Sequence, residues 1–153
     1  MPKNHEAYMQ QDASILELDN QLCFLIYSTN LALHQLYRKL LSPLGLTYPQ
    51  YLVMLVLWEK DQLTVSEIGS RLFLESSTLT PLLKKLEHLG LLSRKRSTRD
   101  ERQVIITLSS QGQELKQQAL DIPHQIAQAS ACNLDELMQL KEQLETLRTN
   151  ISQ

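Results

Sequence analysis

Two cysteines, Cys23 and Cys132, are the first residues whose chemistry stands out in this chain of 153 residues. They form no C-x-x-C pair and no metal-ligand spacing with the histidines, which are His5, His34, His88 and His124. A reducing compartment disfavours a structural disulfide between them. Two interpretations stand: a pair of buried, inert thiols, or a pair that takes part in redox chemistry. No metal site or cofactor is predicted.

A second chemical feature is the basic segment from Arg71 to Arg102. The whole chain carries a net charge of −2. This segment holds eight basic and four acidic residues and is therefore +4, whereas the remainder is −6. A local basic stretch on an acidic body is typical of proteins that bind a polyanion such as nucleic acid. A solvated charged face would explain the charge equally well, so the surrounding elements must decide.

Composition restricts the fold class and the compartment. Only four Gly and five Pro occur, which is too few for the many turns of a β-sandwich and favours helices. The longest apolar run, Leu52 to Trp58, is far shorter than the ~20 residues that span a bilayer. The N-terminus has no apolar signal region. We therefore expect a cytoplasmic protein without a membrane partner.

Apolar periodicity predicts a long helix near each end of the chain. After a polar arm over 1–13, apolar steps of three and four predict one helix over 14–41, with Ser14 and Glu17 as its capping box. This helix would be ~40 Å long, more than one small domain covers, so a partner chain is expected. Two further helices are predicted within 109–151.

The first of these C-terminal helices is expected to begin at Ser109, to continue to about Cys132 and to kink at Pro123. Asn133 is expected to open the second, with Glu136 completing a capping box.

The middle of the chain reads as three shorter helices followed by two strands. Capping boxes open the first two helices, at Thr47 with Gln50 and at Thr64 with Glu67. The third lies within 75–89 and contains Pro81, which suits only a first turn, so its start is expected near Thr78 to Thr80. Its C-terminal stop is Gly90. Strands over 91–96 and 103–108 flank a polar turn and form a hairpin with a basic tip.

This order of elements predicts a mainly α fold with a small β-hairpin, in a single domain over 1–153. A winged helix-turn-helix occupies 47–108, between dimerisation helices over 14–41 and 109–151. Hydroxyl side chains at the start of a recognition helix suit base edges, lysines suit phosphates, and an arginine on the hairpin suits a narrow minor groove. The candidate DNA-binding residues are Ser76, Ser77, Thr78, Thr80, Lys84, Lys85, Arg94, Arg96, Arg99, Asp100 and Arg102.

The stretch over 82–112, LLKKLEHLGLLSRKRSTRDERQVIITLSSQG, resembles the winged-helix signature of the MarR family of transcriptional regulators. The D-x-R of the family's wing falls on Asp100-Glu101-Arg102, where the arginine enters the minor groove and the aspartate orients the wing. In element order the resemblance extends over the whole chain. It implies a homodimer that binds a pseudo-palindromic double-stranded DNA operator, and it implies no enzyme activity.

A narrower resemblance involves the segment LDNQLCFLIYS over 18–28, which is similar to the first helix of the organic-hydroperoxide sensors of the MarR family, the OhrR type. It implies that peroxide oxidises Cys23 and that tyrosines four, fourteen and twenty-five positions later hydrogen-bond the sulfur. Those positions hold Tyr27, Tyr37 and Tyr48. On a helix the first two lie about 40° to either side of Cys23. Because Tyr37 is ~21 Å further along, it could reach only the Cys23 of a partner subunit.

Cys132 lies where the two-cysteine branch of these sensors carries a resolving cysteine, which forms a disulfide across subunits. Its place just before a helix start would favour a thiolate.

The leading hypothesis is a homodimeric repressor that leaves its operator when organic hydroperoxide oxidises Cys23. One alternative is a MarR-type regulator gated by a small aromatic acid in a dimer-interface pocket. The other is a thiol peroxidase, which is disfavoured because the chain has no Pro-x-x-x-Thr-x-x-Cys arrangement.

Overall fold

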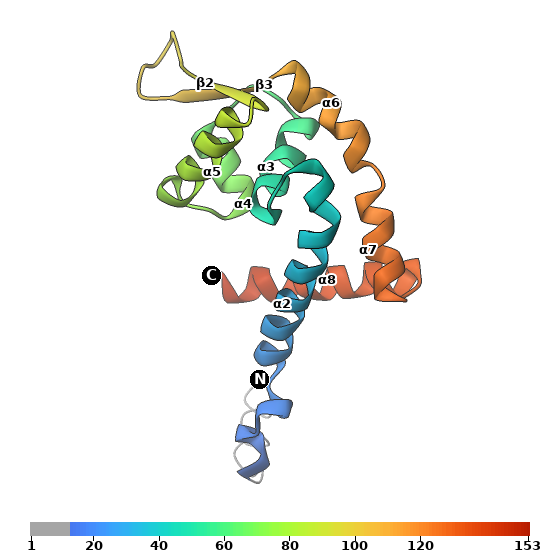
Figure 1. The fold of residues 1–153 in the computed structure, drawn as a ribbon. Coiled ribbons are helices and arrows are strands. Elements are labelled where there is room, and N and C mark those ends of the chain that lie inside the picture. Colours follow the sequence, from blue (N-terminus) through green and yellow to red (C-terminus); the bar gives the residue numbers. More distant parts are fainter. Residues whose placement is uncertain (1–12) are drawn as a thin grey trace. The chain divides into compact units, whose positions relative to one another are not determined.

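The computed structural model describes residues 13–153, so nearly all of the predicted polar arm over 1–13 lies outside the described residues. The chain divides into two compact units, one ending at Lys39 (unit 1) and one over Leu40–Gln153 (unit 2). Helices dominate the described residues, together with a three-stranded antiparallel sheet (Figure 1). The predicted fold class is therefore confirmed.

Unit 1 contains short helical turns and then a long helix: η2 (Ala13–Leu16), η3 (Leu18–Asn20) and most of α2 (Leu22–Leu41). The prediction of one helix starting at Ser14 was wrong. Gln21 is extended, with φ −90° and ψ 115°, and its side-chain amide donates to the carbonyls of Ile15 at 2.7 Å and Glu17 at 2.9 Å. A side chain that donates to nearby carbonyls competes with helix formation. Helix α2 therefore starts at Leu22, directly after Gln21, and is only ~30 Å long.

Unit 2 contains the remaining elements: η4 (Ser42–Leu44), α3 (Tyr48–Glu59), β1 (Leu63–Thr64), α4 (Val65–Leu72), α5 (Ser76–His88), β2 (Leu92–Arg96), β3 (Val104–Leu108), α6 (Ser110–Ala119), α7 (Ile122–Ser130) and α8 (Leu134–Ile151). Helices α4 and α5 form the helix-turn-helix. Strands β2 and β3 with their connecting turn form a hairpin, called the wing below, which extends beyond α5 (Figure 1).

The three predicted reciprocal caps of unit 2 are confirmed. Thr47, Thr64 and Asn133 each accept from the backbone N–H three residues later, and the Gln or Glu at that position accepts from the cap residue in return. Each cap satisfies backbone donors that a helix start would otherwise leave without partners.

The sheet has the strand order β1-β3-β2, with both pairs antiparallel. Leu63 of β1 pairs with Ile106, and Leu92 of β2 pairs with Leu108. The two-residue strand β1 was not predicted, because a strand this short has no readable periodicity. Its pairing with β3 fixes the base of the wing to the start of α4.

The core of unit 2 contains side chains from the end of α2, from α3, α4 and α5, and from the sheet. The largest fully buried ones are Leu41, Met54, Leu57, Ile68, Leu79, Leu83, Leu86 and Ile106. Three of these leucines, Leu79, Leu83 and Leu86, form one face of α5. Burying each such side chain stabilises the fold by roughly 1.5–3 kcal/mol. The packed leucines therefore turn the polar face of α5 outward.

Helix α5 corrects the expected start near Thr78 to Thr80. It begins at Ser76, after Glu75 accepts hydrogen bonds from the N–H groups of Thr78 and Leu79, both at 3.0 Å. Pro81 then lies inside the helix, where it removes only the bond to the carbonyl of Ser77. The helix nevertheless continues to His88, with Ser77 itself on the exposed face.

The predicted helix over 109–132 is two helices rather than one kinked helix. Helix α6 ends at Ala119 and α7 begins at Ile122. Pro123 falls in the first turn of α7, where its missing N–H has no helical partner to lose. Ala131, with φ +53°, then ends α7.

Among the described residues no single helix is both long enough and apolar enough to span a membrane. A bent pair, Leu22–Leu44 with Tyr48–Glu59, meets that test by length and composition only. In the second member of the pair, half of the residues are buried inside unit 2.

Candidate nucleic-acid interface and thiol sites

The turn between α4 and α5 is held tight by close backbone packing. A Cβ on Gly69 would lie 2.7 Å from the carbonyl oxygen of Leu74, so no larger residue fits without a backbone shift. Phe73 ends α4 in the left-handed region, with φ +57°, and the N–H of Leu74 donates to the carbonyl of Gly69 at 3.0 Å. This geometry sets α5 against α4 as in a helix-turn-helix.

The outward face of α5 carries most of the predicted recognition residues. Ser76, Ser77, Thr78, Lys84 and Lys85 are exposed, while Thr80 is half-buried. The hydroxyl groups stand in the first turn and a half, and the lysines follow in the later turns. A helix laid with its start in a major groove could present the hydroxyls to base edges and the lysines to phosphates.

The turn of the wing is organised around Asp100. Its Oδ1 accepts from the backbone N–H and from the Nε of Arg102, both at 3.1 Å. The N–H of Ser97 donates to the carbonyl of Gln103 at 2.8 Å and closes the turn. Arg102 remains 91% exposed, so Asp100 orients its side chain while leaving it accessible to a ligand.

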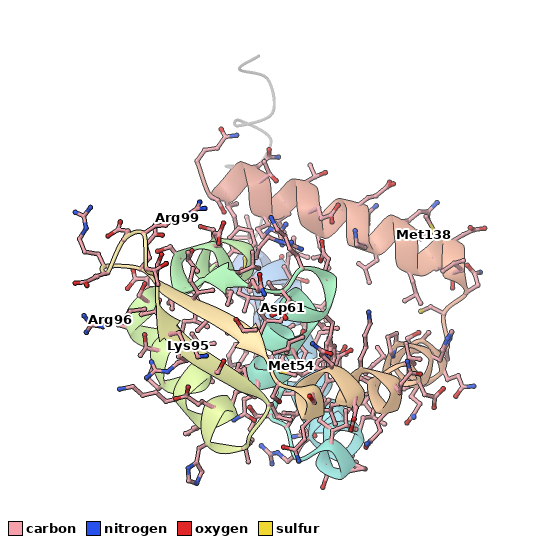
Figure 2. All side chains as sticks on the ribbon, turned by 90° about the horizontal axis from the view of Figure 1, so that it is seen from above. Met54, Asp61, Lys95, Arg96, Arg99 and Met138 are labelled. Carbon is pink, nitrogen blue, oxygen red and sulfur yellow. The ribbon has the colours of Figure 1, made fainter. Side chains whose placement is uncertain are left out.

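Most of the other basic residues of the wing are exposed, and one packs against α5. Arg96 and Arg99 are exposed, as is Lys95, which the sequence analysis did not select (Figure 2). Its place in the basic run from Arg94 to Arg96 was the available signal. Arg94 is different, because its side chain is only 24% exposed and lies against Glu87 of α5.

Ion pairing shows where positive charge remains available. Three of the eight basic residues between Arg71 and Arg102 have acidic partners: Arg71 with Glu59, Arg94 with Glu87, and Arg102 with Asp100. Within residues 13–153, the others form no ion pair: Lys84, Lys85, Lys95, Arg96 and Arg99. Within this segment, the basic residues without an ion pair therefore lie on the later turns of α5 and on the wing.

The pair between Arg71 and Glu59 joins two exposed side chains through two hydrogen bonds. The guanidinium donates to both carboxylate oxygens, at 3.3 Å and 2.9 Å. Its hydrogen bonds and charge lower the pKa of the Glu59 carboxyl and raise the pKa of Arg71. Arg71 therefore joins α3 to α4, and its charge is compensated.

Cys23 lies in the first turn of α2 and is exposed, with the exposed Tyr27 one turn later. Tyr37, three turns beyond Tyr27, is half-buried. Tyr48 opens α3 in unit 2, and burial raises the pKa of its phenol.

Cys132 is exposed in the short link before α8. Its backbone N–H donates to Ser130 Oγ at 3.2 Å, and its Sγ donates to the Ser130 carbonyl at 3.4 Å. The interpretation of two buried thiols is therefore wrong for the single chain. No group of three potential metal ligands occurs in the part of the chain that the structure describes.

Comparison with known proteins gives a consistent family assignment. Residues 35–119 match the family described as "Transcriptional regulator SarA/Rot". The organic hydroperoxide resistance transcriptional regulator of Bacillus subtilis is 46% identical over 145 residues, which cover 95% of this chain and 99% of that protein.

Solved structures of AbfR, a protein from Staphylococcus epidermidis, share this fold. Reduced AbfR bound to DNA is 40% identical, with a TM-score of 0.75 over 89% of this chain and 96% of AbfR. Disulfide-formed AbfR is 39% identical, with a TM-score of 0.61 over 94% and 96%. With these relatives and a winged helix-turn-helix that carries D-x-R at its tip, the chain belongs to the MarR family of transcriptional regulators.

Proposed function

We propose that this protein is a homodimeric repressor that leaves its DNA operator when an organic hydroperoxide oxidises Cys23. The observation on which the proposal rests is the exposed thiol of Cys23, which has Tyr27 one helical turn away. It occurs in a chain whose second unit is a winged helix-turn-helix. The relatives support the proposal, since one is a hydroperoxide resistance regulator and another is known both DNA-bound and in a disulfide form. A repressor of this kind works in the cytoplasm and is not an enzyme.

In the DNA-bound state, α5 lies in the major groove. Ser77 and Thr78 contact base edges there, and Lys84 and Lys85 contact phosphates. The wing follows the backbone with Arg96 and Arg99, and Arg102 enters the minor groove, where the negative potential is strongest. Two copies related by a two-fold axis read a pseudo-palindromic operator.

Exposed apolar side chains support the dimer. On α2 they include Leu22, Leu25, Ile26, Leu31 and Leu33, and on α8 they include Leu134, Met138, Leu140, Leu144 and Ile151. So many exposed apolar residues on one helix favour an interaction surface for each of the two helices. A second copy of the chain provides identical faces, and its burial of these residues completes both helices.

The oxidation step uses the Cys23 thiolate as the nucleophile. It attacks the terminal oxygen of the hydroperoxide and the O–O bond breaks, so that the sulfur becomes a sulfenic acid and an alkoxide leaves, which takes up a proton to give the alcohol. The thiol of Cys132 from the other subunit then attacks that sulfur, giving a disulfide and releasing water. Hydrogen bonds from Tyr27, from the partner's Tyr37 and from Tyr48 stabilise the starting thiolate.

The test is DNA binding before and after one equivalent of cumene hydroperoxide. A duplex selected by the wild-type protein from a random library serves as the probe, and fluorescence anisotropy follows binding. We expect release by the peroxide and restoration by dithiothreitol. Unchanged binding with peroxide would contradict the proposal, and catalytic consumption of peroxide with dithiothreitol would favour the thiol peroxidase.

A groove on unit 2 supports the second candidate, regulation by a small aromatic acid. Its lining is mostly apolar, with one lysine and one glutamate that Arg71 pairs: Tyr51, Leu55, Trp58, Glu59, Lys116, Ala119, Leu120 and Pro123. An apolar groove with a lysine in its lining suits an aromatic carboxylate. Release of the same duplex by benzoate in the absence of oxidant would favour this candidate over oxidation.

The wing gives a direct prediction for DNA binding. Arg102→Ala removes one minor-groove contact among many, and we expect affinity to fall by about 1–3 kcal/mol at physiological salt. Asp100→Ala should produce a smaller loss, because it frees Arg102 from its two hydrogen bonds without removing the charge. Equal affinity of Arg102→Ala and wild type in an anisotropy titration would contradict the minor-groove assignment.

A further inference from the structure

The side chain of Arg94 is engaged inside unit 2, unlike the other basic residues of the wing. The carboxylate of Glu87 accepts the backbone N–H of Arg94 through Oε2 at 2.8 Å, and its Oε1 lies 3.5 Å from Arg94 Nε. That Nε is buried and has no hydrogen-bond partner among the described residues. In contrast, the side chain of Arg102 at the tip is almost fully exposed.

Glu87 and Arg94 also close the short connection between α5 and β2. The N–H of Gly90 donates to the carbonyl of Glu87 at 2.9 Å, and the N–H of Leu91 donates to the carbonyl of Leu86 at 3.0 Å. Gly90 has φ +78°, as the C-terminal stop of a helix requires. At the end of α5, the carboxylate of Glu87 therefore contacts both the backbone N–H and the guanidinium of Arg94 in β2.

Electrostatics disfavours moving Arg94 from this place to a phosphate. A move would separate a partly buried charge from its partner and leave Glu87, itself partly enclosed, facing the DNA without compensation. Lys95 and Arg96 stand next to it, exposed and without ion pairs among residues 13–153, and can bind phosphate at no such cost.

We propose that Arg94 is a positioning residue, which with Glu87 sets the placement of the wing relative to α5 and makes no DNA contact itself. This inference rests on the proposed DNA-binding function. Because α5 and the wing must enter adjacent grooves at the same time, holding them in one arrangement before binding lowers the ordering cost of the complex. Loss of either member of the pair therefore weakens DNA binding.

Whether Glu87→Ala weakens or tightens DNA binding distinguishes a positioning role of Arg94 from direct phosphate binding. If Arg94 only positions the wing, Glu87→Ala weakens binding by about ten-fold, although it removes a negative charge near a polyanion. If Arg94 binds a phosphate, Glu87→Ala frees it and tightens binding. Alanine is a good helix former, so the substitution itself does not oppose α5.

Salt dependence gives a second, independent measurement. Each lost phosphate contact lowers the slope of log K against log salt by about one. We expect Arg94→Ala to weaken binding by about ten-fold with an unchanged slope, and the Glu87→Ala, Arg94→Ala double variant to lose no more than either single variant. Arg96→Ala is the matched control, since its exposed guanidinium is expected to account for about one unit of slope.

The assay uses the full chain and the duplex selected by the wild-type protein, with circular dichroism melting to confirm folding. If Glu87→Ala fails to fold, Glu87→Gln keeps an acceptor for the N–H of Arg94 and should show a smaller loss in the same direction. Tighter or equal binding by the Glu87 variants, or a slope lowered by one in Arg94→Ala, would overturn the positioning role. Absence of DNA binding by wild type would instead contradict the proposed function.

Discussion

Cys23→Ser is expected to bind the selected duplex as wild type does and to remain bound in organic hydroperoxide. Serine has nearly the same shape as cysteine, so the exposed first turn of α2 should be unchanged. Its hydroxyl forms no anion near neutral pH and does not attack a peroxide as a thiolate does. We expect no release over about a hundred-fold excess of the oxidant that frees wild type. Peroxide release of Cys23→Ser would place the sensor elsewhere.

Cys132→Ser is the matched control for this prediction, since Cys132 is the other exposed cysteine. It should still respond to peroxide, because Cys23 is intact, but its sulfenic acid should over-oxidise more readily. Non-reducing electrophoresis of oxidised wild type should show a covalent dimer that disappears in both single variants. A wild-type protein that is oxidised and DNA-free yet monomeric on that gel would contradict the resolving role of Cys132.

Gly112→Ala is expected to cause a large loss of stability. Gly112 lies in the first turn of α6, where intrinsic propensity alone would make alanine more stable by about 1 kcal/mol. Its added Cβ would overlap the backbone carbonyl oxygen of Leu91, which cannot rotate away as a side chain could. The N–H of Gly112 also donates to Ser109 Oγ at 3.0 Å, and its carbonyl accepts from Trp58 Nε1 at 2.8 Å. These contacts hold the helix start in place, so relief by movement is costly.

The expected net loss for Gly112→Ala is about 3 kcal/mol, which lowers Tm by roughly 6–12 °C. Thermal unfolding followed by circular dichroism measures it. Gly45→Ala is the control, because Gly45 has φ +69° but no atom within 4 Å of the added Cβ. It should lose about 1 kcal/mol from backbone strain alone. A Tm of Gly112→Ala at or above that of wild type would show that the Leu91 carbonyl yields easily.

Several features of the fold could be predicted because they depend on neighbours along the chain. The caps at Thr47, Thr64 and Asn133 involve groups three residues apart, so their residue types alone predict them. The orientation of Arg102 by Asp100 is equally local, since the two residues are only two positions apart. The spacing of Tyr27 from Cys23 places both near one face of a helix wherever that helix packs.

Other features could not be predicted, because the interactions that decide them compete with, or override, the local pattern. The side chain of Gln21 donates to two carbonyls and interrupts the helix before α2, although the apolar periodicity of the sequence continues through this position. Strand β1 exists only because Leu63 and Thr64 find partners on β3 more than forty residues later. Pro81 is tolerated within α5 because the core leucines hold the helix on both sides of it.

The charged residues of the candidate DNA interface show most clearly which features the sequence predicts and which depend on tertiary contacts. The residue types of the basic segment by themselves determined that positive charge gathers around α5 and the wing, since charge is a property of composition. Only the tertiary structure decided which charges are available. It brings Glu87 within 3.5 Å of Arg94 and Glu59 within 2.9 Å of Arg71, while Arg96 and Arg99 stay exposed. Coulomb attraction and desolvation depend on distance and burial, and neither quantity exists until the chain has folded.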